Sequence, residues 1–156
     1  MNLKKDTKLK EVLDIGSECK QCGHCCSHGT GFVLESEAKK YPKKYLEEKK
    51  VFNTKVYKFK TSKKPFGKCI FLKNKRCSIH KKKPLHCRIG NCGEHGEELS
   101  VWFTLNYLVN PTDPESVRQW KLYLDSGGKN IPGGKLSELV PDKKMLKKII
   151  SYEVLK

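Results

Sequence analysis

The stretch Cys19-Lys20-Gln21-Cys22-Gly23-His24-Cys25-Cys26 decides how the rest of this sequence is interpreted. Cysteines three apart can turn successive sulfur atoms toward one metal ion or one face of a cluster. The spacing C-x2-C-x2-C is that with which a single loop supplies three ligands to a cubane iron–sulfur cluster. Adjacent Cys25 and Cys26 do not easily place both sulfurs on one small ion. We therefore expect one of them to serve a cluster and the other a second ion, a bridge or a nearby reactive position.

More distant cysteines complete the candidate ligand set. The eight predicted metal ligands are Cys19, Cys22, Cys25, Cys26, Cys69, Cys77, Cys87 and Cys92. Eight thiolates could form two four-coordinate sites, or one site with several further cysteines that do not bind metal. Their softness favours zinc or iron–sulfur over Mg²⁺ or Ca²⁺, which prefer oxygen ligands. We expect an iron–sulfur cluster of the [4Fe–4S] type, with zinc as the alternative.

The cellular compartment that the sequence predicts is one in which cysteines bind metal more often than they form disulfides. The lysine-rich residues 1–11 are not followed by an apolar run of seven or more residues, so we expect no secretory signal. The longest apolar stretch, Val101 to Val109, is far too short to span a bilayer. We therefore expect the chain to stay in the cytoplasm, where thiols are kept reduced. A dense cysteine pattern there indicates metal binding rather than disulfides.

The length and the charge of the chain limit the number of domains and the kinds of partner. A chain of 156 residues is about one domain long. Its formal net charge is +16, and lysine dominates it. Such a field favours anionic partners, namely nucleic acid, acidic protein surfaces or anionic lipid headgroups. Lysine richness can equally reflect genome composition, adaptation to heat or a solvated surface. Nucleic acid is thus a possible partner but not the favoured one.

The first part of the chain predicts short elements around the cysteines. Residues 1–18 indicate a short helix or arm that leads into the first cluster. Ser36 can cap a helix that begins at Glu37, with Pro42 ending or kinking it and a second piece running to about Lys49. Residues 51–60 indicate a strand.

The middle of the chain predicts a cysteine-bearing hairpin. Two short apolar runs flank a polar turn that contains Asn74, which favours a β-hairpin with Cys69 on one arm and Cys77 on the other. Such a turn brings two thiolates together. Residues 81–92 are expected to form a loop because Pro84, Gly90 and Gly93 punctuate this region.

The last third has no cysteine and predicts helices. Residues 99–108 are apolar over ten positions, which favours a buried helix. Asp113-Pro114-Glu115 is typical of a helix start, and that helix carries Val117, Trp120 and Leu124 on one face and stops at Gly127-Gly128. A terminal helix from about Asp142 has Met145, Ile149 and Tyr152 on its apolar face.

These elements together predict an α+β fold. We expect a small cysteine-rich domain organised by metal, with a short β-hairpin, several helices and a mainly helical C-terminal part. Residues 1–156 are expected to form a single domain, in which a metal-binding region at 17–92 is packed by the helical part at 93–156. Neither part alone offers enough core to fold well without the other.

For other polar residues near the cysteines, the sequence gives weaker evidence of a role in metal binding. His24, His28 and His86 lie within two residues of a cysteine, and we interpret them as exposed neighbours of the metal loop rather than ligands. Arg88 could hydrogen-bond to a thiolate or sulfide, or lie on the surface. Gly29-Thr30-Gly31 is too short to indicate a nucleotide loop, and no hydrolase motif is present. Catalytic residues are therefore unknown.

Four motifs in order resemble the YkgJ-type cysteine cluster family of zinc- or iron-chelating domains. They are Cys19-x2-Cys22-Gly-His-Cys25-Cys26, then Gly67-Lys-Cys69-Ile-Phe-Leu72, then Arg76-Cys77-Ser-Ile-His80, and Pro84-Leu-His-Cys87-Arg88. The resemblance covers about residues 17–92. Here Lys83 stands where the family usually has Arg, and His80 where it usually has Tyr, while Cys92 is less regularly placed. The resemblance implies chelation by the cysteines.

Three functions follow from these observations. We expect a metal-cluster-binding protein with a redox, maturation or accessory role. The same cysteine-rich region is found in flagellin lysine N-methylases, so the resemblance also implies a cluster-dependent modifying enzyme related to protein lysine methylation as an alternative. A zinc-stabilised nucleic-acid-binding module that uses the lysine field is the third. Whether the chain is an enzyme stays open at this point.

Overall fold

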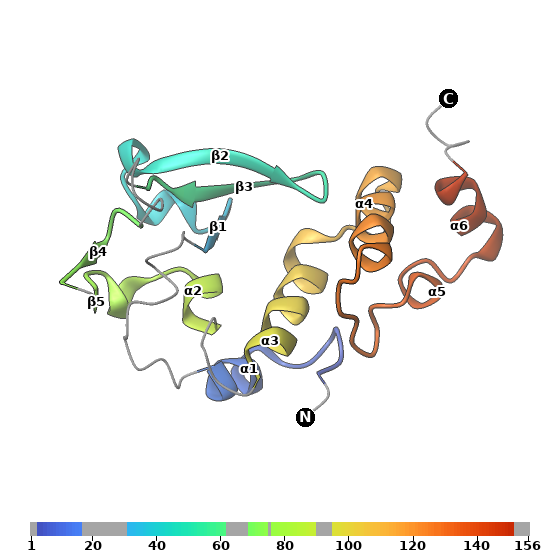
Figure 1. Cartoon of the computed structure of the whole chain (residues 1–156), viewed down its shortest axis with the longest axis horizontal. Helices are drawn as coiled ribbons and strands as arrows, with labels where there is room; N and C mark the ends of the chain where they lie inside the picture. Colours follow the sequence, from blue (N-terminus) through green and yellow to red (C-terminus); the bar gives the residue numbers. More distant parts are fainter. Residues whose placement is uncertain (1–2, 17–30, 62–68, 75, 90–94, 152–156) are drawn as a thin grey trace. The chain divides into compact units, whose positions relative to one another are not determined.

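The structure is a computed structural model that describes residues 3–16, 31–61, 69–74, 76–89 and 95–151. It combines helices with small antiparallel sheets, so the predicted α+β class is confirmed (Figure 1). The described chain forms two compact units. The cysteine unit comprises Leu9–Lys49 and Lys55–Gly96, and the helical unit comprises Met1–Lys8, Lys50–Thr54 and Glu97–Lys156. The single domain over 1–156 stays a prediction.

The cysteine unit contains short elements. In chain order they are α1 (Leu9–Gly16), β1 (Phe32–Leu34), the 3₁₀ turns η2 (Ala38–Lys40) and η3 (Lys43–Tyr45), β2 (Leu46–Val51), β3 (Thr54–Phe59), β4 (Leu72–Lys73), β5 (Arg76–Cys77), η4 (His80–Lys82) and α2 (Leu85–Ile89). Three strands form a sheet in the order β1-β3-β2, and β1 runs antiparallel to β3 with Val33 opposite Tyr57. Val33, Phe59 and Cys69 form a buried cluster, and partly buried apolar side chains pack against it.

The predicted hairpin around Asn74 is confirmed. Strands β4 and β5 pair antiparallel, with Leu72 opposite Cys77. Asn74 has a φ of 51°, a left-handed conformation that asparagine adopts more readily than most residues. The two cysteines differ in position, because Cys77 lies in β5 whereas Cys69 lies three residues before β4 and forms an isolated bridge with Thr61.

Two predictions for the cysteine unit are wrong. The helix expected from Glu37 to about Lys49 is replaced by the turns η2 and η3 and by β2, because residues 46–51 pair with β3 instead of continuing a helix. The predicted strand at 51–60 is confirmed in its larger part by β3 (Thr54–Phe59), and a turn at Phe52 and Asn53 separates it from β2. The loop expected at 81–92 contains η4 and the helix α2.

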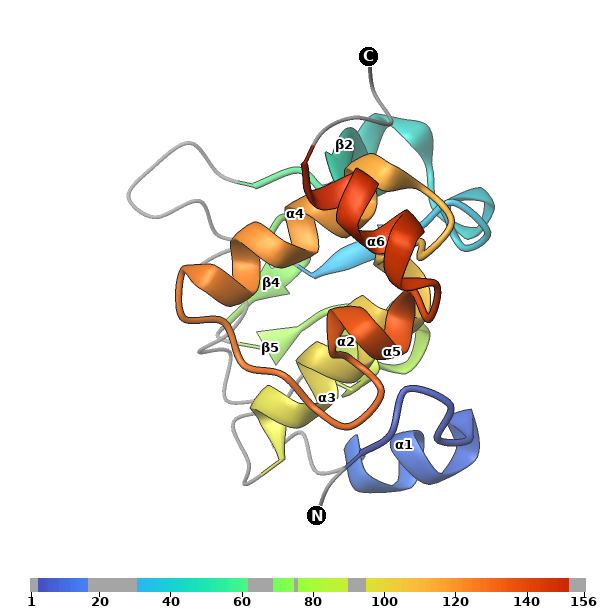
Figure 2. The ribbon, with the colours of Figure 1, turned by 90° about the vertical axis from the view of Figure 1, so that its right-hand side faces the viewer.

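The helical unit follows its local sequence signals. Its elements are α3 (Gly96–Phe103), which begins at the unit's edge, the π-helix η5 (Thr104–Leu108), α4 (Pro114–Asp125), α5 (Leu136–Leu139) and α6 (Lys143–Ile150). Figure 2 shows α6 beside α4 and α5, with which it is in contact. Within the described residues, no helix is long and apolar enough to cross a bilayer.

The helix boundaries in this unit are set by capping side chains. Asp113 accepts a hydrogen bond from the backbone N–H of Glu115, and Asp142 accepts from those of Lys144 and Met145. Gly127, with a φ of 97°, ends α4 as predicted. The helices predicted at 99–108, from Asp113 and from Asp142 are therefore confirmed.

The predicted apolar face of the last helix needs a correction. Ile149 is buried, but Met145 is 45% exposed, and Tyr152 lies outside the described residues. Burial is centred on Ile149 because α6 packs against α4 and α5 through that side. Met145 lies at the exposed edge of the apolar arc. The short helix α5 was not predicted.

The turn between β2 and β3 stores backbone strain. Phe52 and Asn53 have φ values of 51° and 61°, as in a two-residue hairpin turn. A bulky residue in this region costs about 1–3 kcal/mol. The Phe52 ring makes edge contacts with Trp120 and Tyr123, at centroid distances of 5.8 and 6.3 Å, and Asn53 donates a hydrogen bond to Asp113. These contacts hold the turn in the helical unit.

A buried arginine joins two helices of the helical unit. Arg118 on α4 is 3% exposed, and its Nε–H donates a 2.5 Å hydrogen bond to the carbonyl of Ile149 in the last turn of α6. Its Nη1 lies 3.7 Å from Glu115 Oε2. A cation at a helix C-terminus also interacts favourably with the helix dipole. Arg118 therefore fixes the end of α6 against α4.

We expect Arg118→Ala to lower the free energy of unfolding by about 2–4 kcal/mol, because it removes a buried charged partner. Urea denaturation followed by the fluorescence of Trp102 and Trp120 measures this change within the same unit. Lys121→Ala is the matched control on α4. Its exposed pair with Asp125 predicts an effect under about 0.5 kcal/mol. An equal effect of the two substitutions would contradict the role of Arg118.

Candidate metal centre

The structure places three of the eight predicted ligands. Cys69, Cys77 and Cys87 belong to the described residues of the cysteine unit. The other five lie outside the described residues, and they are Cys19, Cys22, Cys25, Cys26 and Cys92. Among the residues that are described, no three His, Cys, Asp or Glu side chains gather as a metal site. The predicted ligand set as a whole stays a prediction.

Cys69 is positioned by an aromatic cluster, which we define as Tyr41, Tyr45, Phe59 and Phe71. Phe59 lies edge-on to Phe71 with ring centroids 4.7 Å apart, and Tyr41 lies edge-on to Phe59 at 5.1 Å. Cys69 is 8% exposed in the same apolar core. Its carbonyl accepts a hydrogen bond from the N–H of Leu72, which turns the chain into β4. The Cys69 thiol is therefore shielded from water by rings.

Cys87 lies on α2, a helix that distant residues stabilise. Five residues are too few for a helix to be stable alone. Its first N–H, that of Leu85, donates a 2.9 Å hydrogen bond to Glu37 Oε2, while Glu37 Oε1 accepts a 3.2 Å bond from the N–H of Leu34. Leu85 and Ile89 are buried one turn apart. Glu37 thus caps α2 and ties it to the end of β1.

Gly31 makes the closest approach to Cys87. A Cβ added to Gly31 would lie 2.8 Å from Cys87 Sγ and 3.2 Å from His86 Nδ1. A methyl group fits this gap only if the Cys87 sulfur or the His86 ring shifts. The sequence does not predict this role, because the short Gly29-Thr30-Gly31 pattern does not reveal a neighbour far along the chain.

His86 has a structural role that sequence reasoning missed. Its Nδ1 accepts a 2.8 Å hydrogen bond from the N–H of Phe32, and its ring stacks on Phe32 with centroids 5.4 Å apart. Burial, reinforced by the charge of Lys58, lowers the pKa of His86 to about 4, so the imidazole is neutral at physiological pH. With Nδ1 used as an acceptor, the neutral ring carries its proton on Nε2. His86 is half-buried rather than exposed, and it holds β1 against α2.

The two described ends that flank residues 17–30 both lie at α2. Helix α1, which ends at Gly16, contacts α2, and so does β1, which begins at Phe32 (Figure 1). The approach of Gly31 to Cys87 and the Phe32–His86 hydrogen bond fix the second of these ends. The described residues on both sides of the first cysteine motif therefore contact α2.

Tyr41 packs against the core that contains Cys69 and lies within electrostatic reach of Cys77 and Cys87. Its hydroxyl donates a 2.5 Å hydrogen bond to the carbonyl of Lys82. Burial raises the pKa of Tyr41 to about 12, with further contributions from the negative charges of Glu37, Cys87 and Cys77 and an opposing one from Arg88. Cys77 and Cys87 therefore lie within electrostatic reach of the same hydroxyl. The exposed Arg88 also lies within that reach.

Comparison with known proteins gives one family. The family model CxxCxxCC, described as "Putative zinc- or iron-chelating domain", matches residues 18–102, which is more than half of the chain. No curated protein and no solved structure matches the chain.

The approach of Gly31 to Cys87 generates a prediction. We expect Gly31→Ala to lower the free energy of unfolding by about 1–3 kcal/mol, because the added methyl group overlaps the Cys87 sulfur. Thermal unfolding followed by circular dichroism measures the change under fixed metal conditions.

A double-mutant cycle with Cys87→Ala separates this contact from a general effect of alanine. Removal of the sulfur relieves the nearest overlap, so Gly31→Ala should lose at least about half of its effect in the Cys87→Ala background. The same cost in both backgrounds would show that the two residues do not meet in this way.

Proposed function

This chain belongs to the CxxCxxCC family of zinc- or iron-chelating domains, and from that premise we propose that its cysteines bind an iron–sulfur cluster. Metal chelation is the function of the family domain, and the cluster is the finer assignment that we add. The proposed ligands are the eight cysteines of the sequence, with a [4Fe–4S] cluster as the expected form. The proposed role is in redox chemistry, maturation or as an accessory protein.

The observation that carries the proposal is that the elements on either side of residues 17–30, α1 and β1, both contact α2. Gly31 lies against Cys87 Sγ and α1 lies against α2, so the described residues that precede and follow the four-cysteine segment both contact the helix that carries Cys87. Three cysteines in C-x2-C-x2-C spacing and a fourth from a distant part of the chain are the ligand supply of a cubane cluster. This arrangement supports Cys87 as the distant ligand.

The donor atoms and their surroundings fit such a group. Thiolates are the ligands of iron–sulfur clusters, and zinc also accepts them. The aromatic cluster shields Cys69 from water, and a hydrophobic shell around a site controls solvent access and reduction potential. Glu37 and His86 hold α2, and hence Cys87, in position.

Each part of the chain has a distinct task in this proposal. The thiolates would hold the cluster, which supplies one-electron transfer when bound. Glu37 and His86 keep the Cys87 backbone fixed against β1. Gly31 lets the chain pass close to the Cys87 sulfur. Tyr41 stays protonated, since its pKa is raised to about 12, and its hydroxyl donates a hydrogen bond to the carbonyl of Lys82.

Anaerobic purification with metal and sulfide analysis tests the proposal. We expect a brown protein with iron, acid-labile sulfide and a broad absorption near about 400 nm. A colourless protein with stoichiometric zinc and no sulfide would replace the cluster by a structural zinc site and leave chelation intact.

Cys87→Ser tests the proposed distant ligand. We expect it to lose most of the bound iron and sulfide, because a serine hydroxyl is a poor substitute for a thiolate at such a centre. Ser78→Ala, an exposed change beside Cys77, is the control that should retain both. Unchanged iron and sulfide in Cys87→Ser would remove Cys87 from the ligand set.

A further inference from the structure

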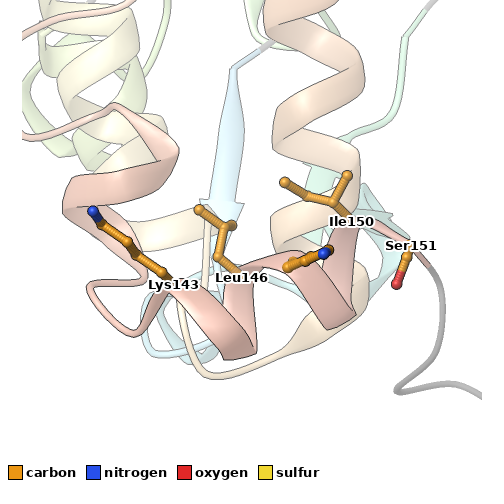
Figure 3. A pocket seen from close by; sticks show the side chains of 5 residues that line it. Lys143, Leu146, Ile150 and Ser151 are labelled. Carbon is orange, nitrogen blue, oxygen red and sulfur yellow. The ribbon is translucent and has the colours of Figure 1, made fainter.

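The last helix carries a shallow apolar groove with lysines beside it. The groove has a volume of about 360 Å³ and is lined by Lys143, Leu146, Lys147, Ile150 and Ser151 (Figure 3). Figure 3 shows Leu146 and Ile150 projecting to the same side of α6. All of the lining residues that the structure describes come from this helix and the residue after it, so the groove is a feature of one helix face.

Helical spacing explains how this face arises. Leu146 and Ile150 are four residues apart, as are Lys143 and Lys147, so each pair forms one row along the helix. Ile149 takes the buried position toward the core. The aliphatic row therefore lies half-buried at the border of the packed side, and the lysine row lies next to it in solvent.

The charge on this helix has one sign. Residues 143–150 include four lysines and no acidic residue. Asp142, the nearest carboxylate in sequence, is used as the N-cap and accepts backbone hydrogen bonds. Within the described part of the chain, none of the ion pairs involves a lysine of α6. The ammonium groups are thus available to an anionic surface.

We propose that this groove on α6 docks on the surface of an anionic lipid bilayer. A basic helix with aliphatic side chains at its border fits the bilayer interface, where apolar groups enter the headgroup region and lysines meet lipid phosphates. The chain as a whole, with a net charge of +16, is attracted to the same surface. The inference does not depend on which metal the cysteines bind.

The composition of the groove favours a bilayer over nucleic acid or a partner helix. Nucleic-acid surfaces combine basic residues with aromatic side chains on which bases stack, whereas the aliphatic row here is Leu146 and Ile150. A partner helix is normally held in a groove with apolar walls on both sides. The described lining of this groove is confined to one helix, so it offers a face rather than such a slot.

Vesicle co-sedimentation of the full chain tests the proposal. The probes are vesicles of phosphatidylcholine with about 30 mol % phosphatidylglycerol and vesicles of phosphatidylcholine alone. A lysine near an anionic surface contributes about fivefold in partitioning. We therefore expect K143E/K147E to lower the partition coefficient on anionic vesicles by about tenfold or more.

Matched variants on the same helix separate the groove from total charge. K144E/K148E makes the same charge change on lysines that do not line the groove, and we expect it to lower partitioning by at most about threefold. L146S/I150S keeps the charge and should lower partitioning, whereas Met145→Ser removes an exposed apolar residue outside the groove and should not. Circular dichroism establishes that each variant is folded, and the lysine pairs decide the question if L146S/I150S does not fold.

Three results would overturn the proposal. The first is an equal loss for the two lysine-pair variants, which would mean that net charge alone drives binding. The second is equal binding of the wild-type chain to the two kinds of vesicle. The third is binding of a single-stranded RNA oligonucleotide that K143E/K147E abolishes while vesicle binding is unchanged.

Discussion

The capped attachment of α2 to β1 is the constraint on which the rest of the cysteine unit depends. Helix α2 has five residues and cannot persist through its own hydrogen bonds. The Glu37 carboxylate satisfies its first N–H, the Phe32–His86 bond joins it to the neighbouring strand, and Leu85 and Ile89 bury its apolar side. The approach of Gly31 to the Cys87 sulfur depends on this arrangement. The geometry of a thiol is here fixed by carboxylate and imidazole groups that do not themselves need to touch a metal.

The parts of the fold that sequence could predict are those governed by neighbours along the chain. Asp113 and Asp142 start helices, Gly127 ends one and Asn74 turns a hairpin, because each acts on backbone groups within a few residues. The helix expected after Glu37 failed for the opposite reason. The Glu37 side chain bonds to Leu85, 48 residues away, and β2 exists because it pairs with β3.

The candidate site divides in the same way. The number and spacing of the eight cysteines are enough to predict them as ligands, because metal-binding motifs are recognised by residue type and by the interval between residues. They do not reveal that Gly31 lies against the Cys87 sulfur, that His86 is half-buried and neutral, or that Tyr41 lies within electrostatic reach of Cys77 and Cys87. Those roles depend on pairs far apart along the chain, 41 residues in the Tyr41–Lys82 bond and 54 in the Phe32–His86 bond, and no local pattern encodes the partner.

The distance along the chain between β1 and α2 also sets an order of events during biosynthesis. The first cysteine motif leaves the ribosome about sixty residues before α2, so Cys87 and its support do not yet exist when the first four thiols emerge. Throughout that interval the nascent chain carries Gly31 and Phe32 without the sulfur and imidazole that they later contact. Oxidants and metal carriers thus meet an incomplete set of cysteines first, and this interval ends only after Cys92 has been synthesised.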